Sequence, residues 1–108
     1  MEEELVEDLT EKLIEAVIRN DAELVYDLIM NGADPSVTLD SDNITPLHFA
    51  AQNNALDVVP LLIAGGADIH AQTWPDGKTP LSIAQLHNHY QMITLLLAYD
   101  SSNIDSVH

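Results

Sequence analysis

Two closely spaced histidines, His87 and His89, are the residues of this sequence most suited to chemistry near neutral pH. Imidazole side chains bind zinc and other transition metals or act as acid and base, so the pair suggests a metal-dependent hydrolase. Side chains two residues apart are expected to diverge on a helix, and the intervening Asn88 is typical of a helix end. We therefore predict a structural or surface role, with the metal-dependent hydrolase as the alternative.

Other residues and motifs of enzyme chemistry are lacking in the sequence. It contains no cysteine, which excludes disulfides, thiolate zinc sites, iron–sulfur clusters and cysteine nucleophiles. The serines show no adjacent histidine and acid in a strained turn, and the four glycines form no phosphate-binding loop. We expect a protein that is not an enzyme and that needs no cofactor or metal.

The charge balance limits the kind of partner. Eighteen acidic residues against three basic residues give the 108-residue chain a formal net charge of −15. This charge excludes a protein that follows nucleic acid phosphates, and an anionic membrane would repel it. Eleven of the eighteen carboxylates precede Pro35. One interpretation is solubility with a solvated N-terminal cap, and the other is recognition of a basic protein surface.

The same composition predicts one soluble domain. Apolar residues make up 46% of the chain, which argues against wholesale disorder. The acidic start, Met1 through Glu4, is unlike a signal peptide, and no apolar run approaches the roughly 18 residues of a membrane span. We expect a cytoplasmic protein, with the nucleus as the alternative.

An internal repeat of 34 residues indicates how the elements are arranged, because a fixed period of this size is typical of stacked units. The repeated positions are Thr45-Pro46-Leu47 with Thr79-Pro80-Leu81, Ala50 with Ala84, Asn54 with Asn88, Leu61-Leu62 with Leu95-Leu96, and Gly32-Ala33-Asp34 with Gly66-Ala67-Asp68.

Each unit carries the signals of two short helices. Thr45 and Thr79 can accept a hydrogen bond at a helix start, and each is followed by a proline, which tolerates the first helical position. Asn54 and Asn88 stand where the first helix would end, since asparagine tolerates a left-handed backbone. An apolar second helix follows, and Gly65-Gly66 closes it in the middle unit. Helices that are apolar on most sides must be covered by neighbours.

The segments Thr45-Pro46-Leu47-His48-Phe49-Ala50-Ala51, Leu61 through Asp68 and Asp76 through Leu81 resemble the ankyrin repeat. The resemblance implies an all-α solenoid of helix-turn-helix pairs joined by β-hairpin loops, which forms a single domain over residues 1–108. The repeats are expected at roughly 8–36, 45–70 and 79–104, after an acidic extension at 1–7. The resemblance also implies that His48 and His89 make structural hydrogen bonds.

The two ends of this array differ. Glu15 stands where the next repeat has Phe49, and Asp27 stands where it has Leu61, which predicts a water-facing cap at the N-terminus. The C-terminal end is less clearly capped, so residues 99–108 or a partner are expected to cover it. We expect a monomer, with a homodimer through this face as the alternative. Its uncovered apolar residues would be Ile83, Leu86, Met92 and Leu97.

Ankyrin proteins bind partners through a concave face made of first helices and hairpin tips, so the resemblance implies a non-enzymatic protein-interaction module of the adaptor or regulatory kind. The alternative is an acidic inhibitor or immunity-type protein that blocks a basic, nucleic-acid-binding target. Trp74 would be an interface anchor or would lie flat on the neighbouring tip. The expected partner-binding residues are Ile18, Arg19, Gln52, Asn53, Leu86 and His87 on the helices, and Asp40, Asp42, Ile44, Trp74, Asp76 and Lys78 at the tips.

Overall fold

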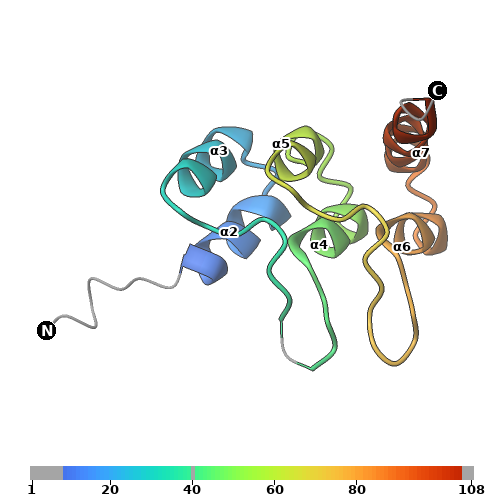
Figure 1. The fold of residues 1–108 in the computed structure, drawn as a ribbon, viewed down its shortest axis with the longest axis horizontal. Helices are drawn as coiled ribbons and strands as arrows, with labels where there is room; N and C mark the ends of the chain where they lie inside the picture. Colours follow the sequence, from blue (N-terminus) through green and yellow to red (C-terminus); the bar gives the residue numbers. More distant parts are fainter. Residues whose placement is uncertain (1–8, 40, 106–108) are drawn as a thin grey trace, which may run out of the picture.

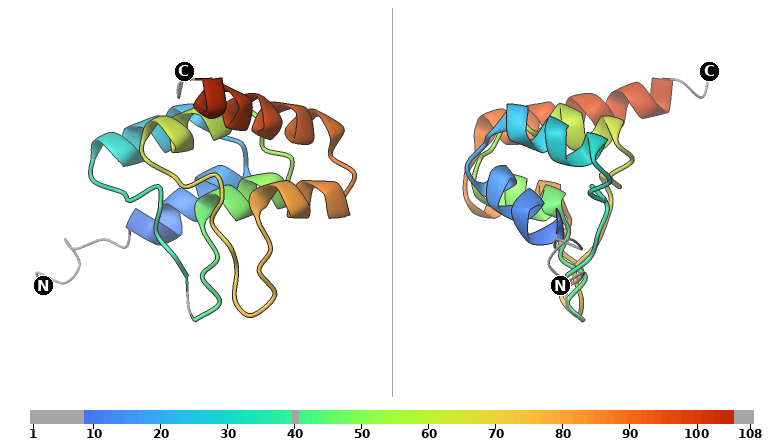
Figure 2. Two further views of the ribbon diagram at one scale, coloured as in Figure 1. Left: turned by 45° about the vertical axis from the view of Figure 1, so that its right-hand side comes forward. Right: turned by 90° about the vertical axis from the view of Figure 1, so that its left-hand side faces the viewer.

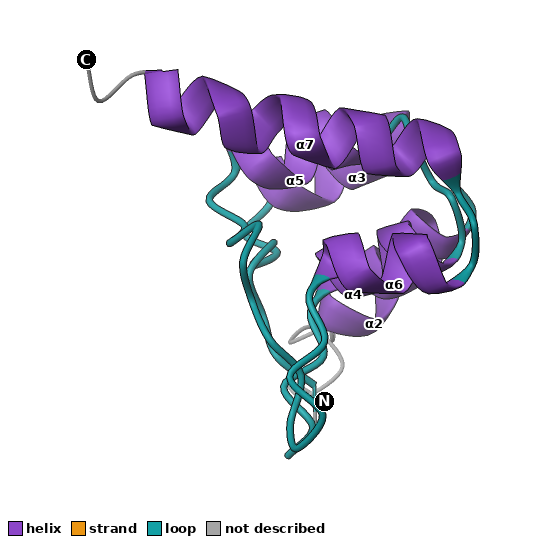
Figure 3. Cartoon of the chain, turned by 90° about the vertical axis from the view of Figure 1, so that its right-hand side faces the viewer, coloured by secondary structure: helices purple, strands orange, loops and turns teal. Residues whose placement is uncertain are grey.

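The computed structural model describes residues 9–39 and 41–105, so the predicted extension at 1–7 and the candidate Asp40 lie outside the described residues. Within these ranges the chain forms helices in two layers, one over the other (Figures 1 and 3). The first helices of the three pairs form one layer and the second helices form the other, as predicted for a helical solenoid. The first helices are α2 (Leu9–Ile18), α4 (Pro46–Gln52) and α6 (Pro80–Leu86), and the second helices are α3 (Ala22–Met30), α5 (Val59–Ala64) and α7 (Tyr90–Asp105).

The predicted start and stop signals act as expected. Thr45 and Thr79 cap α4 and α6 through their side chains, and Pro46 and Pro80 occupy the first helical turn. Asn54 and Asn88 adopt positive φ angles of 54° and 58° between the helices of their pairs. Asparagine tolerates this left-handed region better than other residues that have a side chain. Each pair is therefore closed by a tight turn.

Gly65 and Gly66 end α5, as the sequence predicted, and the reason is partly tertiary. Gly66 has a φ of +109°, which residues with a Cβ rarely adopt. A Cβ at Gly65 would approach the Pro35 side chain to 2.8 Å. The helix thus ends where the preceding loop lies against its backbone. In the last repeat Tyr99 and Asp100 stand at these positions, and α7 continues to Asp105.

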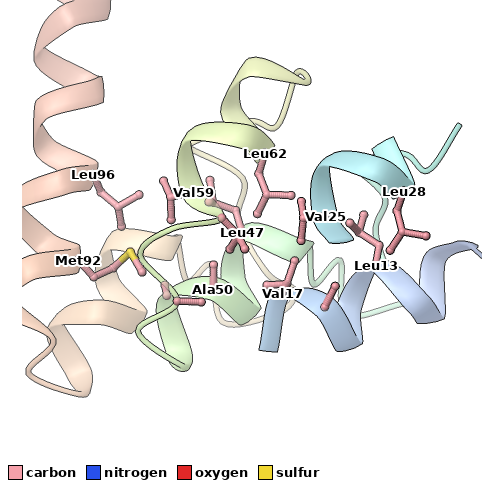
Figure 4. Packing of buried hydrophobic residues seen from close by; sticks show 14 of the residues in the cluster. Leu13, Val17, Val25, Leu28, Leu47, Ala50, Val59, Leu62, Met92 and Leu96 are labelled. Carbon is pink, nitrogen blue, oxygen red and sulfur yellow. The ribbon is translucent and has the colours of Figure 1, made fainter. Parts of the chain in front are cut away.

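The core lies between the two helical layers and runs along the stack. Figure 4 shows Leu13, Leu47 and Leu62 pointing into the space between the helices, and all three are fully buried. In the same view Met92 and Leu96 of α7 point toward Val59 of α5. Leu62 and Leu96, which the 34-residue period relates, therefore occupy the interior of successive repeats.

The two ends of the stack differ in how well they fit the predictions. The predicted N-terminal cap is present, but the predicted cover of the C-terminal end is not. Glu15 and Asp27 are exposed, in keeping with a water-facing N-terminal cap. The expectation that residues 99–108 cover the other end is wrong for the described part, because these residues prolong α7 and leave Leu86 65% and Leu97 44% exposed. Met92, predicted to lie on the uncovered face, is fully buried in the core.

Two long loops connect the pairs and project side by side from the helical layers (Figure 2). The first loop is held by one antiparallel bridge, in which the Leu39 N–H donates to the Ile44 oxygen at 2.7 Å. In the second loop the Thr73 N–H donates to the Lys78 oxygen at 2.9 Å. The described residues form no β-strand, so the predicted hairpins are present as loops with isolated ladder bonds.

Candidate functional site

The base of the second loop is held in place by a buried histidine of the middle repeat. His48 Nδ1 accepts a hydrogen bond from the Thr45 N–H at 3.0 Å, which leaves Nε2 as the protonated nitrogen of the neutral ring. Nε2 then donates to the carbonyl oxygens of Ala71 at 3.1 Å and Lys78 at 2.9 Å. The structural role predicted for His48 is confirmed, and its bonds fix where the loop leaves the helices.

The environment of His48 favours its neutral form. Burial lowers the pKa of His48 from the ordinary value of 6.5, and the hydrogen bonds to the Lys78 and Ala71 carbonyls oppose this effect in part. A proton on Nδ1 would also face the Thr45 N–H, which already donates to that nitrogen. The imidazole is thus a structural tie between a helix and a loop.

The two loops are joined to each other near their tips. The Trp74 N–H donates to the Asp42 carbonyl oxygen at 2.8 Å, across from one loop to the next. In the second loop the Gly77 N–H donates to the Thr73 oxygen at 2.8 Å, and the Lys78 N–H donates to Thr73 Oγ1 at 3.0 Å. The backbone of Trp74 is therefore fixed while its side chain remains 65% exposed.

Between the loops and the first helices lies a groove of about 320 Å³, which we call the loop groove. Its apolar part consists of Ile44, Phe49 and Ile83, all half-buried, together with the Trp74 ring. Its polar part includes Asp42 and Asp76, which occupy equivalent positions of the two loops, 34 residues apart. The lining residues are Asp42, Ile44, His48, Phe49, Gln52, Thr73, Trp74, Pro75, Asp76, Lys78 and Ile83.

Half of the predicted partner-binding residues line this groove: Asp42, Ile44, Gln52, Trp74, Asp76 and Lys78. Ile44, expected at a hairpin tip among the partner-binding residues, is half-buried, because it pairs with Leu39 in the first loop. The remaining predicted residues that the structure describes are exposed but lie outside the groove; these are Ile18, Arg19, Asn53, Leu86 and His87.

Ile18, Ile44 and Leu86 are the aliphatic members of the expected partner-binding set, and they do not form one continuous apolar strip. Ile18 lines a separate hollow on α2 with Ile14 and Leu39, and Leu86 lines neither hollow. Arg19, predicted to face a partner, forms an exposed ion pair with Glu15 at 3.0 Å one helical turn away. The Asn53 side chain donates to the Phe49 oxygen at 2.9 Å and so helps to end α4.

Phe49 and Ile83 are groove residues that the sequence reasoning did not select. They occupy equivalent positions 34 residues apart, and in the first repeat that position is Glu15. Phe49 also precedes Gln52 by three residues, which places both on one face of α4. Helical spacing combined with the repeat could have identified them, but whether they were core or surface depended on the loops beside them.

The paired histidines differ from expectation in their geometry. The rings of His87 and His89 do not diverge; they stack with centroids 5.7 Å apart and planes 18° from parallel, because both lie in the turn after α6 and not on a helix. His89 Nε2 lies 3.1 Å from the Gln52 carbonyl oxygen, which confirms its structural hydrogen bond to the preceding repeat. Among the described residues, no three histidine, aspartate or glutamate side chains come together as metal ligands.

Searches of known proteins agree with this architecture. A family model described as ankyrin repeats, three copies, matches residues 13–107. No curated protein matches the chain. In the part of the chain that the structure describes, no helix has the length and hydropathy to cross a membrane. The family match spans most of the chain and agrees with the stacked helix pairs. The chain therefore belongs to the ankyrin repeat family.

Proposed function

We propose that the chain is a non-enzymatic adaptor or regulatory module that binds a protein partner in the loop groove. Ankyrin repeats generally mediate protein–protein interaction. The observation that carries the proposal for this chain is the exposed Trp74 ring beside a groove of about 320 Å³. Tryptophan is enriched among the residues that dominate binding energy, because it buries a large apolar area with few rotatable bonds.

The lining of the groove favours a partner segment that combines an apolar and a basic side chain. The half-buried Ile44, Phe49 and Ile83 offer apolar contact, while Asp42 and Asp76 offer two carboxylates. A basic side chain near both carboxylates could also lie on the Trp74 ring, where a cation is attracted by the π electrons. The net charge of −15 adds long-range attraction for a basic partner.

The groove is suited to binding because its walls are held before a partner arrives. The bonds from His48 to the Ala71 and Lys78 carbonyls tie the second loop to α4. The bond from Trp74 to Asp42 ties the second loop to the first. A partner therefore pays little entropy for ordering these loops, which leaves more of the contact energy as affinity.

The experiment is affinity capture from the native cell with a matched pair of variants. Trp74→Ala removes the exposed ring of the groove, and Tyr26→Ala removes an exposed ring from α3, outside it. We expect proteins captured by the parent chain and by Tyr26→Ala to be lost with Trp74→Ala. The same captured set with all three proteins would show that the groove is not the binding site.

The second candidate, an acidic inhibitor of a basic protein, is favoured by the position of the carboxylates. Glu23 and Asp27 are exposed on α3, far along the stack from the loop groove. Neutralising them with Glu23→Gln and Asp27→Asn would weaken an inhibitor that uses the acidic end. The pair Asp42→Asn and Asp76→Asn would instead weaken a partner held in the groove.

Salt gives a further distinction between the two candidates. Exposed charges interact weakly beyond a Debye length, which falls from about 30 Å at 0.01 M to about 3 Å at 1 M salt. Affinity that falls steeply over this range, and equally for Trp74→Ala and the parent chain, would support the acidic inhibitor. Affinity that is lost with Trp74→Ala at every salt concentration would support the groove-binding adaptor, whose basic partner would itself add some salt dependence.

A further inference from the structure

We propose that the last repeat pairs with the last repeat of a second copy of this chain, through the outward-facing stripe of α7. The stripe consists of Tyr90, Ile93 and Leu97, at helical spacings of three and four residues, so that the side chains lie along one face of the helix. Tyr90 is 72% and Leu97 44% exposed, and Ile93 is half-buried.

The same three positions are more deeply covered in the two earlier repeats. Val25 and Val59, the equivalents of Ile93, are fully buried. The equivalents of the exposed Tyr90 and Leu97 are half-buried in both earlier repeats; they are Ala22 and Leu56 for Tyr90, and Ile29 and Ile63 for Leu97. The stripe is therefore less covered in the last repeat than in the earlier ones. Its inner side still has partners, because Ile93 packs against the core and Leu97 lines a small hollow with Leu81.

Part of the C-terminal end has become polar, and the stripe has not. Gln85 of α6 is exposed where Val17 and Ala51 are fully buried in the earlier repeats. The substitution of glutamine for a small apolar residue is what a water-facing end requires. On α7, in contrast, apolar side chains are retained at positions where they face outward.

The distribution of charge favours a second copy of this chain as the partner that covers the stripe. Residues 79–99 contain no aspartate, glutamate, lysine or arginine, although the chain carries a net charge of −15. For the nearest described carboxylate of α7, that of Asp100, Oδ1 lies 3.1 Å from His70 Nε2. Two copies could thus meet at this surface without placing like charges opposite each other, which would be destabilising.

Most of the acidic residues, eleven of eighteen, precede Pro35 and so belong to the other end of the chain. Glu15, Glu23 and Asp27 are exposed on α2 and α3, and the molecule extends 49 Å along its longest axis. Figure 1 shows α2 and α3 at the opposite end of the stack from α7. Screening limits exposed charges to about 8–10 Å at physiological salt, so copies joined at α7 keep their acidic ends beyond mutual repulsion.

The geometry of such a pair is a two-fold contact between antiparallel α7 helices. In a two-fold interface each copy presents the same patch, and uncharged apolar surface is typical of homodimers. The stripe is centred near Ile93 and Thr94, so Tyr90 of one copy would lie opposite Leu97 of its partner. The α7 helix has 16 residues, whereas α5 has 6, so α7 is long enough for an extended contact between two copies.

The test is analytical ultracentrifugation of the full chain over about 1 µM to about 1 mM, the range of weak to moderate affinities. We expect the mass to rise with concentration from 11.8 kDa to twice that value. A mass of one chain at every concentration would overturn the proposal. Growth beyond two chains would also overturn it, because a two-fold contact closes on itself.

Two variants with the same added charge locate the contact. Leu97→Glu places a carboxylate on the stripe and should weaken self-association at least about 30-fold, the effect of losing an interface hot spot. Gln91→Glu adds the same charge on another face of α7, at the position where the exposed Asp57 stands in the middle repeat. Its self-association should match the parent chain. Equal self-association of the two variants would contradict a contact through the stripe.

A cross-link tests the arrangement even if a charged variant unfolds. The chain has no cysteine, so Thr94→Cys introduces a single thiol near the predicted two-fold axis. Under mild oxidation we expect a disulfide-linked dimer from Thr94→Cys and little from Gln91→Cys. Equal cross-linking of both variants would show random collision, and would overturn the antiparallel α7 pair.

Discussion

The middle repeat (residues 45–70) and the last repeat (residues 79–105) start with nearly the same four residues and use them differently. His48 and Ser82 each complete a capping box with the threonine that begins the helix. Only His48 also reaches the Ala71 and Lys78 carbonyls of the loop that follows, whereas the hydrogen bonds of Ser82 are to Thr79. Both repeats have the helix cap, but only in the middle repeat does the capping side chain also hydrogen-bond to the following loop.

The junctions on the two sides of the middle repeat also differ. At the first junction the Asn20 side chain donates to Asp57 Oδ2 at 3.2 Å and accepts from the Asp57 N–H at 2.9 Å. At the second junction the equivalent pair is Asn54 and Gln91, and Asn54 Oδ1 is buried without a hydrogen-bond partner. The two junctions therefore differ in their polar contacts, although the same asparagine stands in both.

The largest expected effect is a difference in the free energy of unfolding between two leucine-to-alanine variants, one at the buried Leu62 and one at the exposed Leu97. Leu62→Ala should lower the free energy of unfolding by about 2–5 kcal/mol, because it empties a fully buried site in the middle of the array. Leu97→Ala should change it by about 0.5 kcal/mol or less in dilute protein, since this side chain packs on one side only. Urea unfolding followed by circular dichroism measures both. Similar losses would contradict the difference between inner and outer repeats.

The next effect compares the two capping side chains. His48→Ala removes the donor to two carbonyl oxygens as well as the cap, and should cost about 2–3 kcal/mol. Ser82→Ala removes the cap alone and should cost about 1 kcal/mol. If the same unfolding experiment gave equal losses, the tie between His48 and the second loop would not contribute to stability.

The stability of the fold should depend on pH through His48. Its pKa is lowered by burial, so the unfolded chain binds a proton that the folded chain excludes as the pH falls below 6.5. Stability from this group is therefore fully present above the ordinary pKa and decreases as the pH falls toward the lower, folded value. Unfolding measured at a series of pH values should show this loss in the parent chain. The slope assigned to this group should disappear in His48→Gln.

The smallest effect would make the second junction resemble the first. Gln91→Asp provides a carboxylate at the position of Asp57 and should stabilise the fold by about 0.5–1.5 kcal/mol, because it can accept a hydrogen bond from Asn54 Nδ2 as Asp57 accepts one from Asn20 Nδ2. Combining it with Asn54→Ala in a double-mutant cycle isolates the pair. A coupling energy of zero would show that the two junctions cannot be interchanged.

The sequence could predict which residues lie at the loop tips, but it could not predict which helix residues those tips lie against. Trp74, Asp42 and Asp76 could be assigned to loop tips from the turn residues and the 34-residue period, and the structure places all three along the groove. Ile18 and Leu86 were assigned to the same binding surface because they occupy equivalent positions on the first helices. In the structure, both lie outside the loop groove. The path of each long loop, 31–45 and 65–79, depends on what it packs against, so residue spacing alone could not bring its tip to a particular helix.

Local chemistry alone determined the helix pairs of this protein. Threonine, proline, asparagine and glycine at a 34-residue period set where helices start and turn, because capping and left-handed backbone depend on neighbouring residues. Tertiary structure decided which equivalent positions are covered: Val25 and Val59 are fully buried, while Ile93 is not. Burial depends on what lies in the next layer of the stack, and the apolar residue at this position is retained in the last repeat as in the earlier ones, so its type alone does not tell whether that layer is present.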